Sequence, residues 1–344
     1  VDWDFYKEEY KKFLPHIDNN YDFSEMLSEM LGELNASHTG CMYRPRRSNS
    51  DQTASVGLIF DHSFDGKGLK VERIIDKSPA AFSGKISSGD ILLAVNDVSL
   101  GVNQPYASLM NRVAGQSTRF KFKSANGNEY DLVLKPIGQG SLQNLVYHQW
   151  VDNREKEVDS LSGGRLGYVH VRGMNDASFR TVYDKALGKY ANREGLIVDT
   201  RFNGGGWLHD DLATFLNGEK YFEISPRGQK LGSEPMFKWH KPSVVLMGEG
   251  NYSDAHMFPE TYKALGIGKL VGMPVPGTAT AVWWETQIDP TLVFGIPQVG
   301  IKINDGRFLE NKQLEPDIKV PLTPEKAIEG EDEQLIEAVR LMML

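Results

Sequence analysis

Four short apolar runs in the second half of the chain constrain its fold most strongly. They cover residues 166–171, 195–199, 243–247 and 269–271. Each has the length of a buried strand, and helical patterns of apolar residues separate the runs at 177–190, 208–216 and 255–265. Strands that alternate with helices predict an α/β domain built in layers. Further strands at 283–288 and 299–303 and an acidic amphipathic helix at 325–341 are expected to complete it.

The first half of the chain has a different organisation. Apolar residues at helical spacing predict two helices, at 3–14 and 23–34, and a polar, basic run at 44–53 is typical of a linker. Short strands are predicted next, at 55–60, 69–75, 91–95, 119–123 and 130–134, with a helix at 105–113. An extended or partly helical connector at 142–158 leads to the α/β part. The 344 residues are enough for two or three domains.

Composition argues against several classes of protein. The net charge of -8, without a long basic block, argues against a nucleic-acid partner, and no apolar run approaches the ~20 residues that span a bilayer. The single cysteine, Cys41, excludes an internal disulfide and is better explained as a small apolar filler than as a nucleophile. The start at Val1, without a Met or a signal peptide, suggests a piece of a longer protein and leaves a cytoplasmic or periplasmic location open.

Ser253 stands at the turn between the predicted strand at 243–247 and the predicted helix at 255–265. A serine at such a turn projects its hydroxyl from the rim of a sheet, where N–H groups at the helix start can hold a developing oxyanion. The residue is therefore a candidate nucleophile. An isolated Ser-Asp pair is more often a helix N-cap, and the turn alone does not decide between these interpretations.

Two other features are ambiguous by themselves. Three glycines, Gly204 to Gly206, follow a predicted buried strand and can turn backbone N–H groups toward a ligand, as an oxyanion hole or a phosphate site requires. No lysine follows them, which argues against a nucleotide, and a tight turn is the structural alternative. His38 follows the second predicted helix, but a single histidine is more often structural than catalytic.

Three segments in the first half resemble a PDZ domain across roughly residues 55–137. They are Val56-Gly57-Leu58-Ile59, Ser78-Pro79-Ala80-Ala81 and the run from Gly89 to Asn96. The resemblance implies that the loop Gly57-Leu58-Ile59 presents N–H groups to a peptide carboxylate while the peptide adds as a strand to the sheet edge. Ile59 replaces the usual glycine of this loop. The alternative is a PDZ fold that only braces its neighbour.

Five features occur in the order seen in the tricorn protease core, a branch of the C-terminal processing serine proteases. They are Ser37-His38 after a helix, the PDZ-like region, the run Arg201-Phe202-Asn203-Gly204-Gly205-Gly206, Ser253-Asp254, and Glu310-Asn311 shortly before Pro316-Asp317. The chain resembles this family over essentially its whole length. The resemblance implies a crotonase-like (ClpP/crotonase) α/β protease domain at 139–344, an N-terminal helical segment of the same catalytic unit at 1–53, and a PDZ domain inserted at 54–138. It also implies β-propeller domains upstream of Val1.

Carried over by position, the resemblance implies a serine peptidase that works through an acyl-enzyme. Ser253 would be the nucleophile, His38 the general base, and Ser37 and Glu310 the other members of a tetrad. A serine hydroxyl needs an imidazole within hydrogen-bond reach and a group that orients that imidazole, and the residue types fit these tasks. Whether Glu310 or Ser37 orients the ring stays open.

The same resemblance implies that the backbone N–H groups of Gly206 and Asp254 form the oxyanion hole. The expected substrates are peptides or unfolded polypeptides, with no metal or cofactor, and a homo-oligomer stays open. The alternative to a peptidase is a catalytically silent scaffold that binds peptides through its PDZ domain.

Two departures from the family bear on the catalytic group. His256 stands close to Ser253 where the family has an acid, so it is a rival to His38 as the base. Gln313 replaces a glycine after Glu310-Asn311, so the loop that carries Glu310 is expected to differ.

A third departure bears on specificity. Ile224, beside Glu223, falls near the position of the acid that selects basic side chains in tricorn proteases. We therefore expect an apolar or mixed cleavage preference, and a basic preference only if Glu223 faces the pocket.

Overall fold

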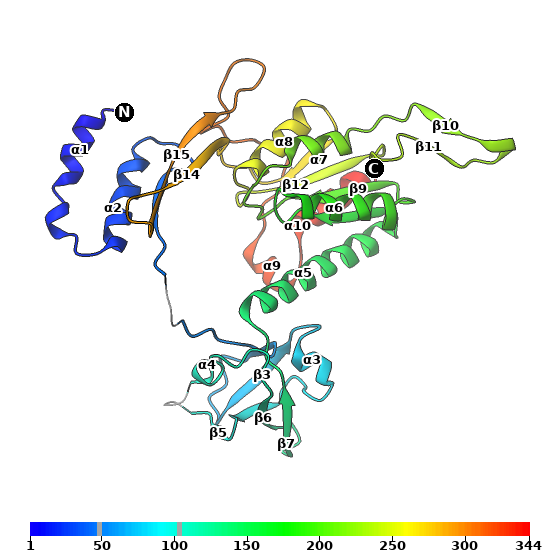
Figure 1. The fold of residues 1–344 in the computed structure, drawn as a ribbon. Coiled ribbons are helices and arrows are strands. Elements are labelled where there is room, and N and C mark those ends of the chain that lie inside the picture. Colours follow the sequence, from blue (N-terminus) through cyan, green and yellow to red (C-terminus); the bar gives the residue numbers. More distant parts are fainter. Residues whose placement is uncertain (47–49, 102–104) are drawn as a thin grey trace. The chain divides into compact units, whose positions relative to one another are not determined.

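The computed structural model describes residues 1–46, 50–101 and 105–344, which fall into two compact units (Figure 1). The first unit contains Val1–Arg46 and Arg154–Leu344, and the second contains Arg47–Asn153. Two stretches of chain therefore build the first unit, and the second unit is inserted in the sequence between them. No helix in the described ranges is both long and apolar enough to cross a bilayer.

A parallel sheet forms the core of the first unit, with the strand order β16-β13-β12-β9-β8. Its strands are β8 (Leu166–His170), β9 (Gly195–Asp199), β12 (Ser243–Met247), β13 (Lys269–Gly272) and β16 (Ile318–Lys319). Every residue of β8, β9 and β12 is buried, so both faces of the sheet are covered, as is usual for a parallel sheet. The predicted mixed α/β fold is confirmed.

Helices of the first unit pack on this sheet and complete its core. They are α6 (Asp176–Asp184), continued by the π-helix η2 (Lys185–Lys189), α7 (His209–Leu216), α8 (Asp254–Ala264) and α10 (Glu333–Met342). The prediction of one helix at 325–341 is wrong, because α9 (Pro324–Glu329) ends at Gly330 with φ at 90°. Asp332 then caps α10 by accepting a hydrogen bond from the Leu335 N–H.

The N-terminal stretch belongs to the first unit through a second, antiparallel sheet. The sheet has the order β1-β15-β14, from β1 (Gly40–Tyr43), β15 (Leu292–Gly300) and β14 (Thr280–Thr286). Helices α1 (Trp3–Lys11) and α2 (Asn20–Gly32) precede it, with the short helix η1 (Leu14–His16) between them. The Ser28 hydroxyl of α2 donates to the Cys41 carbonyl and accepts from the Cys41 N–H, so α2 is bound to β1. Cys41 is free and buried.

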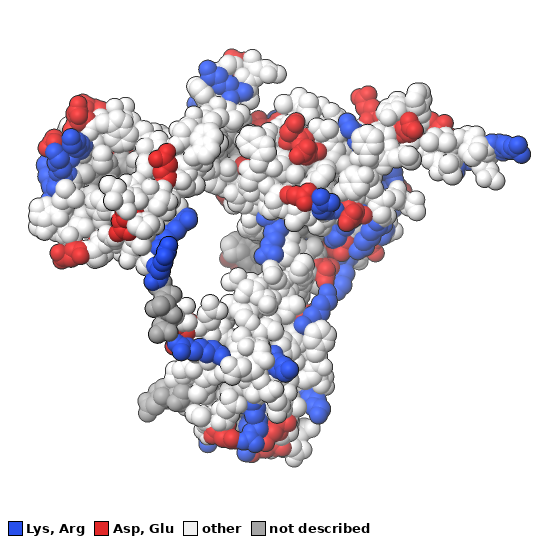
Figure 2. All heavy atoms as spheres, in the orientation of Figure 1, with Lys and Arg blue, Asp and Glu red and all other residues white. Residues whose placement is uncertain are grey.

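A hairpin extends from the first unit between α7 and β12. Its strands are β10 (Phe222–Ile224) and β11 (Gly232–Glu234), and the short helix η3 (Pro226–Gly228) forms the tip (Figure 1). Figure 2 shows acidic and basic side chains interspersed over the face in view, without a continuous basic surface among the residues described.

The second unit is an antiparallel sheet with two short helices. Its strand order is β2-β3-β4-β6-β7, and β5 pairs with β4. The elements are β2 (Leu58–Phe60), β3 (Leu69–Ile74), α3 (Pro79–Ser83), β4 (Ile91–Val95), β5 (Val98–Ser99), α4 (Tyr106–Leu109), β6 (Thr118–Lys123) and β7 (Glu129–Leu134). Apolar residues from these strands, with Phe120, Phe122 and Leu92 fully buried, form a core of its own.

Two predictions for this half need correction. The helix predicted at 105–113 is the single turn α4, with Met110 as its C-cap. The connector at 142–158 is fully helical, because it lies within the 24-residue helix α5 (Gln139–Ser162), which continues across the boundary at Arg154.

Candidate active site

The backbone of Ser253 adopts a conformation that few non-glycine residues adopt. Ser253 connects the loop after β12 to the first residue of α8, with φ at 57° and ψ at -124°. The Ser253 N–H donates to Thr278 Oγ1 at 3.0 Å, and the Ser253 carbonyl accepts from the His256 N–H at 2.8 Å. A strained turn of this kind, held by hydrogen bonds on both sides, is typical of functional positions.

The glycine loop after β9 lies directly against this turn. A Cβ atom on Gly205 would lie 2.6 Å from the Ser253 Cβ, and a Cβ on Gly206 would lie 2.0 Å from the Met174 carbonyl oxygen. Both glycines have positive φ, at 98° and 143°. The loop therefore needs glycine for close approach as well as for its conformation.

The buried Asn203 holds the glycine loop in place. Its Nδ2 donates to the Val171 carbonyl, its Oδ1 accepts from the Gly205 N–H at 2.8 Å, and its carbonyl accepts from the Tyr252 N–H. Among the described residues, the Gly206 N–H has no hydrogen-bond acceptor.

Asp254 joins the starts of two helices. Its carboxylate accepts from the N–H groups of Leu208 and His209 at 2.5 and 3.0 Å, and from His209 Nδ1 at 2.5 Å. This hydrogen bond raises the pKa of His209 above its usual value. The Asp254 side chain is thereby fixed on α7, while its N–H belongs to the first turn of α8, where a helix supplies no acceptor.

Four polar side chains from distant parts of the chain meet on the other side of the site. Ser37 donates to Glu310 through its N–H at 2.5 Å and through its hydroxyl at 3.1 Å. Nδ1 of His38 lies 2.8 Å from Ser37 Oγ and 2.9 Å from Thr280 Oγ1. Because Nδ1 is already hydrogen-bonded, Nε2 is the ring nitrogen that can accept a proton during a reaction.

Tyr252 connects this group to the turn that carries Ser253. Its hydroxyl accepts from the His38 N–H at 2.8 Å, and the two rings lie 4.7 Å apart between centroids. Tyr252 immediately precedes Ser253, so His38 contacts the residue next to the candidate nucleophile. No direct hydrogen bond joins Ser253 and His38 in the described ranges, and such bonds are often long in unliganded sites.

Burial lowers the pKa of the His38 imidazole, and the negative charge of Glu310 acts in the opposite direction. The ring is therefore neutral at neutral pH, which is the protonation state that a general base requires.

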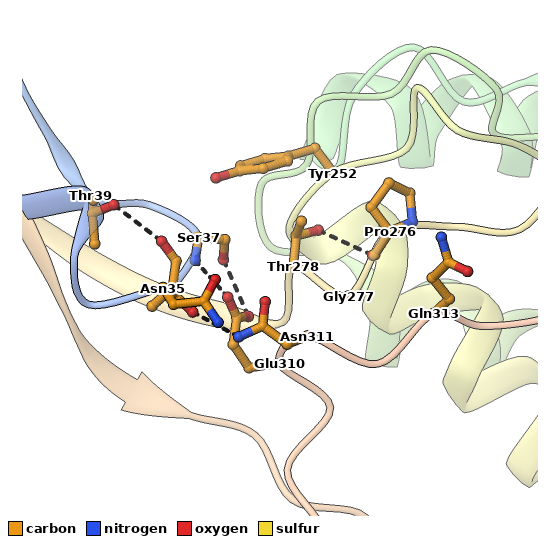
Figure 3. A pocket seen from close by; sticks show the side chains of 12 residues that line it. Asn35, Ser37, Thr39, Tyr252, Pro276, Gly277, Thr278, Glu310, Asn311 and Gln313 are labelled. Atoms are coloured by element: carbon orange, nitrogen blue, oxygen red, sulfur yellow. Dashed lines mark hydrogen bonds between the residues drawn. The ribbon is translucent and has the colours of Figure 1, made fainter. Parts of the chain in front are cut away.

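A cavity of 530 Å³ opens beside this group (Figure 3). Figure 3 shows the side chains of Ser37 and Glu310 directed toward one another, with Tyr252 and Thr278 on the opposite wall. Asn311, with φ at 58°, donates to the Asn35 carbonyl at 2.6 Å and so fixes the loop that carries Glu310. Gln313 lines the same cavity.

The remaining residues predicted from the sequence lie apart from this group. His256 is fully buried on α8, and its Nδ1 accepts from the Thr278 N–H at 3.2 Å. Glu223 and Ile224 belong to β10, where Glu223 pairs with Lys220 at 2.7 Å, and neither residue lines the cavity of Figure 3.

Sequence reasoning did not find Tyr252, Thr278 or Thr280. Threonines and tyrosines are common, and only the fold brings these three to the site.

Comparison with known proteins shows what the chain is similar to. The model of "Peptidase family S41" matches residues 165–320, and that of the "Tricorn protease C1 domain" matches residues 1–32. The tricorn protease of Thermoplasma acidophilum is 25% identical over 96% of this chain, and tricorn protease homolog 1 of Streptomyces coelicolor is 28% identical over 100% of it. A crystal structure of the tricorn protease, 24% identical, matches 98% of the chain with a TM-score of 0.84.

The chain is thus similar to peptidases of family S41 over residues 165–320. Over nearly its whole length it is similar to the core of tricorn proteases, with whose solved structure it shares its fold. The chain spans about a third of its relatives, namely 32% and 33% of the two curated proteins and 33% of the solved chain. The alternative of a catalytically silent scaffold finds no support in these matches. Within the described residues, no group of three or more His, Cys, Asp or Glu side chains could hold a metal ion.

Proposed function

We propose that the whole protein hydrolyses peptides or unfolded polypeptides through an acyl-enzyme on Ser253, with His38 as the general base. The observation that carries the proposal is the hydrogen-bonded group of Ser37, His38 and Glu310 beside the strained turn of Ser253. Ser37, Glu310 and Tyr252 of this region also line the cavity of 530 Å³.

In the first step, Ser253 Oγ attacks the substrate carbonyl while its proton moves to His38 Nε2. The Nδ1–H of the resulting imidazolium donates to Ser37 Oγ or Thr280 Oγ1, and Ser37 in turn donates to Glu310. The carboxylate therefore stabilises the imidazolium through the Ser37 hydroxyl. The N–H groups of Gly206 and Asp254 stabilise the oxyanion.

The tetrahedral intermediate then releases the amine, which takes its proton from His38. Water attacks the acyl-enzyme with His38 again as the base, the ester bond to Ser253 breaks, and the hydroxyl regains its proton. No metal or cofactor takes part in this scheme.

Cleavage preference is proposed to be apolar or mixed. A cavity of 250 Å³ borders α8, and Met257 in its wall lies one helical turn after Ser253. The lining also includes the apolar residues Ala264, Leu265, Ile301, Ile303 and Leu309, and the polar or charged residues His209, Glu260, Thr261, Lys302 and Asn304. Such a lining favours apolar side chains over a single charge type.

We also propose a crotonase-like fold for the α/β domain at 139–344, with the helical segment at 1–53 as part of it, and a PDZ domain at 54–138. β2 is an edge strand of its sheet in the described ranges, so a peptide can add beside it. The Gly57 N–H already donates to Ser55 Oγ at 3.0 Å, and Ile59 is paired with Arg73 of β3. The carboxylate would therefore bind to the N–H of Leu58.

The test is turnover of a peptide library by single variants. Ser253→Ala and His38→Ala are expected to lower kcat/KM by several orders of magnitude, about 10³-fold or more, with unchanged thermal unfolding. Ser160→Ala, at an exposed position on α5, is the matched control. Near-parental turnover in Ser253→Ala would contradict the proposal.

A further inference from the structure

His256 is a fully buried histidine that the reaction scheme does not use. It is the third residue of α8, and its side chain is completely removed from solvent. Nδ1 accepts from the backbone N–H of Thr278 at 3.2 Å. Since an N–H needs an acceptor, Nδ1 carries no proton, and the neutral ring has its proton on Nε2.

His256 is hydrogen-bonded to Thr278, and Thr278 is in turn hydrogen-bonded to the backbone of Ser253. Thr278 Oγ1 accepts the N–H of Ser253 at 3.0 Å and contacts the Pro276 carbonyl at 3.5 Å. Two hydrogen bonds therefore connect the buried ring to the Ser253 backbone. This is the backbone whose φ of 57° needs support from its surroundings.

The other ring nitrogen has no comparable role. His256 Nε2 has no hydrogen-bond partner in the described part of the chain, and its nearest carboxylate oxygen is Glu260 Oε1 at 3.6 Å. Glu260 lies one turn further along α8. The hydrogen-bonding function of the ring is thus confined to Nδ1.

We infer that His256 is a positioning residue that acts as a neutral acceptor, holding Thr278 and through it the strained backbone of Ser253 in the reactive geometry. This inference rests on the proposed function, because it concerns the same nucleophile. It also assigns a role to His256 other than that of a second base. A ring that rotated to take the Ser253 proton would release the Thr278 N–H.

Substitution of His256 by asparagine or by glutamine distinguishes a role as hydrogen-bond acceptor from a role that only fills space. In His256→Asn, the side-chain oxygen can occupy the place of Nδ1, whereas in His256→Gln the oxygen lies further out, near the place of Nε2. We expect His256→Asn to keep kcat/KM within about threefold and His256→Gln to lose about ten- to hundredfold, mainly in kcat. His256→Leu, which fills space without an acceptor, is expected to behave like His256→Gln.

A variant of Thr278 tests the hydrogen bond between Thr278 and Ser253. Thr278→Val removes the hydroxyl that accepts from Ser253 and keeps the Thr278 N–H. Since both changes act on one chain of hydrogen bonds, the double variant His256→Gln, Thr278→Val should lose less than the product of the two single losses. Thermal unfolding of each variant shows whether it is folded.

The outcomes are distinct. Parental kcat/KM in folded His256→Leu, or equal losses in the Asn and Gln variants, overturns the inference while leaving the proposed function intact. A larger KM with unchanged kcat in His256→Gln also overturns it. If the parent protein shows no turnover that Ser253→Ala removes, the proposed function fails, and the inference fails with it.

Discussion

At the scale of single residues, the site depends on groups that keep another group in position. Asn203 holds the glycine loop, Asp254 joins α7 to α8, and Ser37 lies between Glu310 and His38. Each of these side chains makes two or more hydrogen bonds, so each is fixed before a substrate arrives. Preorganised polar groups of this kind are the largest contribution to catalysis in many enzymes.

The lowered pKa of His38 predicts the acid limb of the pH profile. The base must be neutral, so kcat/KM should rise with pH through the pKa of His38 and reach half its maximum below about 6.5, the usual value for histidine. Glu310→Gln removes the charge that raises this pKa, so the midpoint should move to still lower pH. Profiles of kcat/KM for the parent and Glu310→Gln measure both effects. A midpoint above the usual histidine value, or a shift upward in the variant, would contradict the assignment.

The glycine loop offers a matched pair of substitutions. Gly205→Ala places a methyl group 2.6 Å from the Ser253 Cβ at a positive φ, so the turn must move. We expect a loss of about 10²-fold in kcat/KM, the size of effect that a misplacement of about 1 Å produces. A Cβ on Gly204 meets nothing within 4 Å, so Gly204→Ala should stay near parental activity. Equal activities of the two variants would show that Gly205 does not constrain the nucleophile.

At the scale of elements, sequence patterns predicted what depends on local burial. The runs at 195–199 and 243–247 are strands β9 and β12 to the residue, because continuous apolar runs suit a sheet buried on both faces. The patterns missed the full length of α5, because its apolar residues do not recur clearly at helical spacing. They also missed the end of α9, because a single glycine in the left-handed conformation, Gly330, ends that helix.

The candidate site likewise contains residues that the sequence indicated and residues that it did not. Ser37, His38 and Glu310 came from a resemblance, and the structure brings them into one hydrogen-bonded group. Thr280 contacts Ser37, and Tyr252 contacts His38. More than 200 residues of sequence separate the partners in each pair, so no local pattern could indicate Thr280 or Tyr252.

A buried ion pair joins the last helix to the central sheet and predicts a large effect on stability. Asp332 accepts from Arg201 Nη1 and Nη2 at 2.8 and 2.9 Å, and Asp199 binds the same guanidinium. Asp332→Ala leaves a buried charge partly uncompensated and removes the α10 cap, so we expect a loss of about 3–5 kcal/mol in the free energy of unfolding. Thermal denaturation measures it, with Asp305→Ala in an exposed pair as the control. A similar, small change in both variants would contradict the assigned role of the pair.

The β10–β11 hairpin contains Glu223 and Ile224, on which the prediction of cleavage preference rests. Glu223 is paired with Lys220 and lies 3.6 Å from Lys230, so its charge is already neutralised on the hairpin. We expect a peptide-library profile with apolar or mixed preference and no change in Glu223→Gln. Exclusive cleavage after Lys or Arg that Glu223→Gln abolishes would show that Glu223 faces a substrate pocket.

At the scale of the whole molecule, the proposed catalytic residues come from two separate stretches of the chain. Residues before Arg46 supply Ser37 and His38, and residues after Arg154 supply Ser253 and Glu310, so the first unit is incomplete without both stretches. The second unit has its own core and an edge strand, β2.

The most direct measurement is the site of reaction with a fluorophosphonate, mapped by mass spectrometry of the labelled protein. We expect one adduct per chain, on the peptide that contains Ser253, and a labelling rate that falls by orders of magnitude in His38→Ala. No adduct in the folded protein, an adduct on another serine, or equal labelling of His38→Ala would contradict the account.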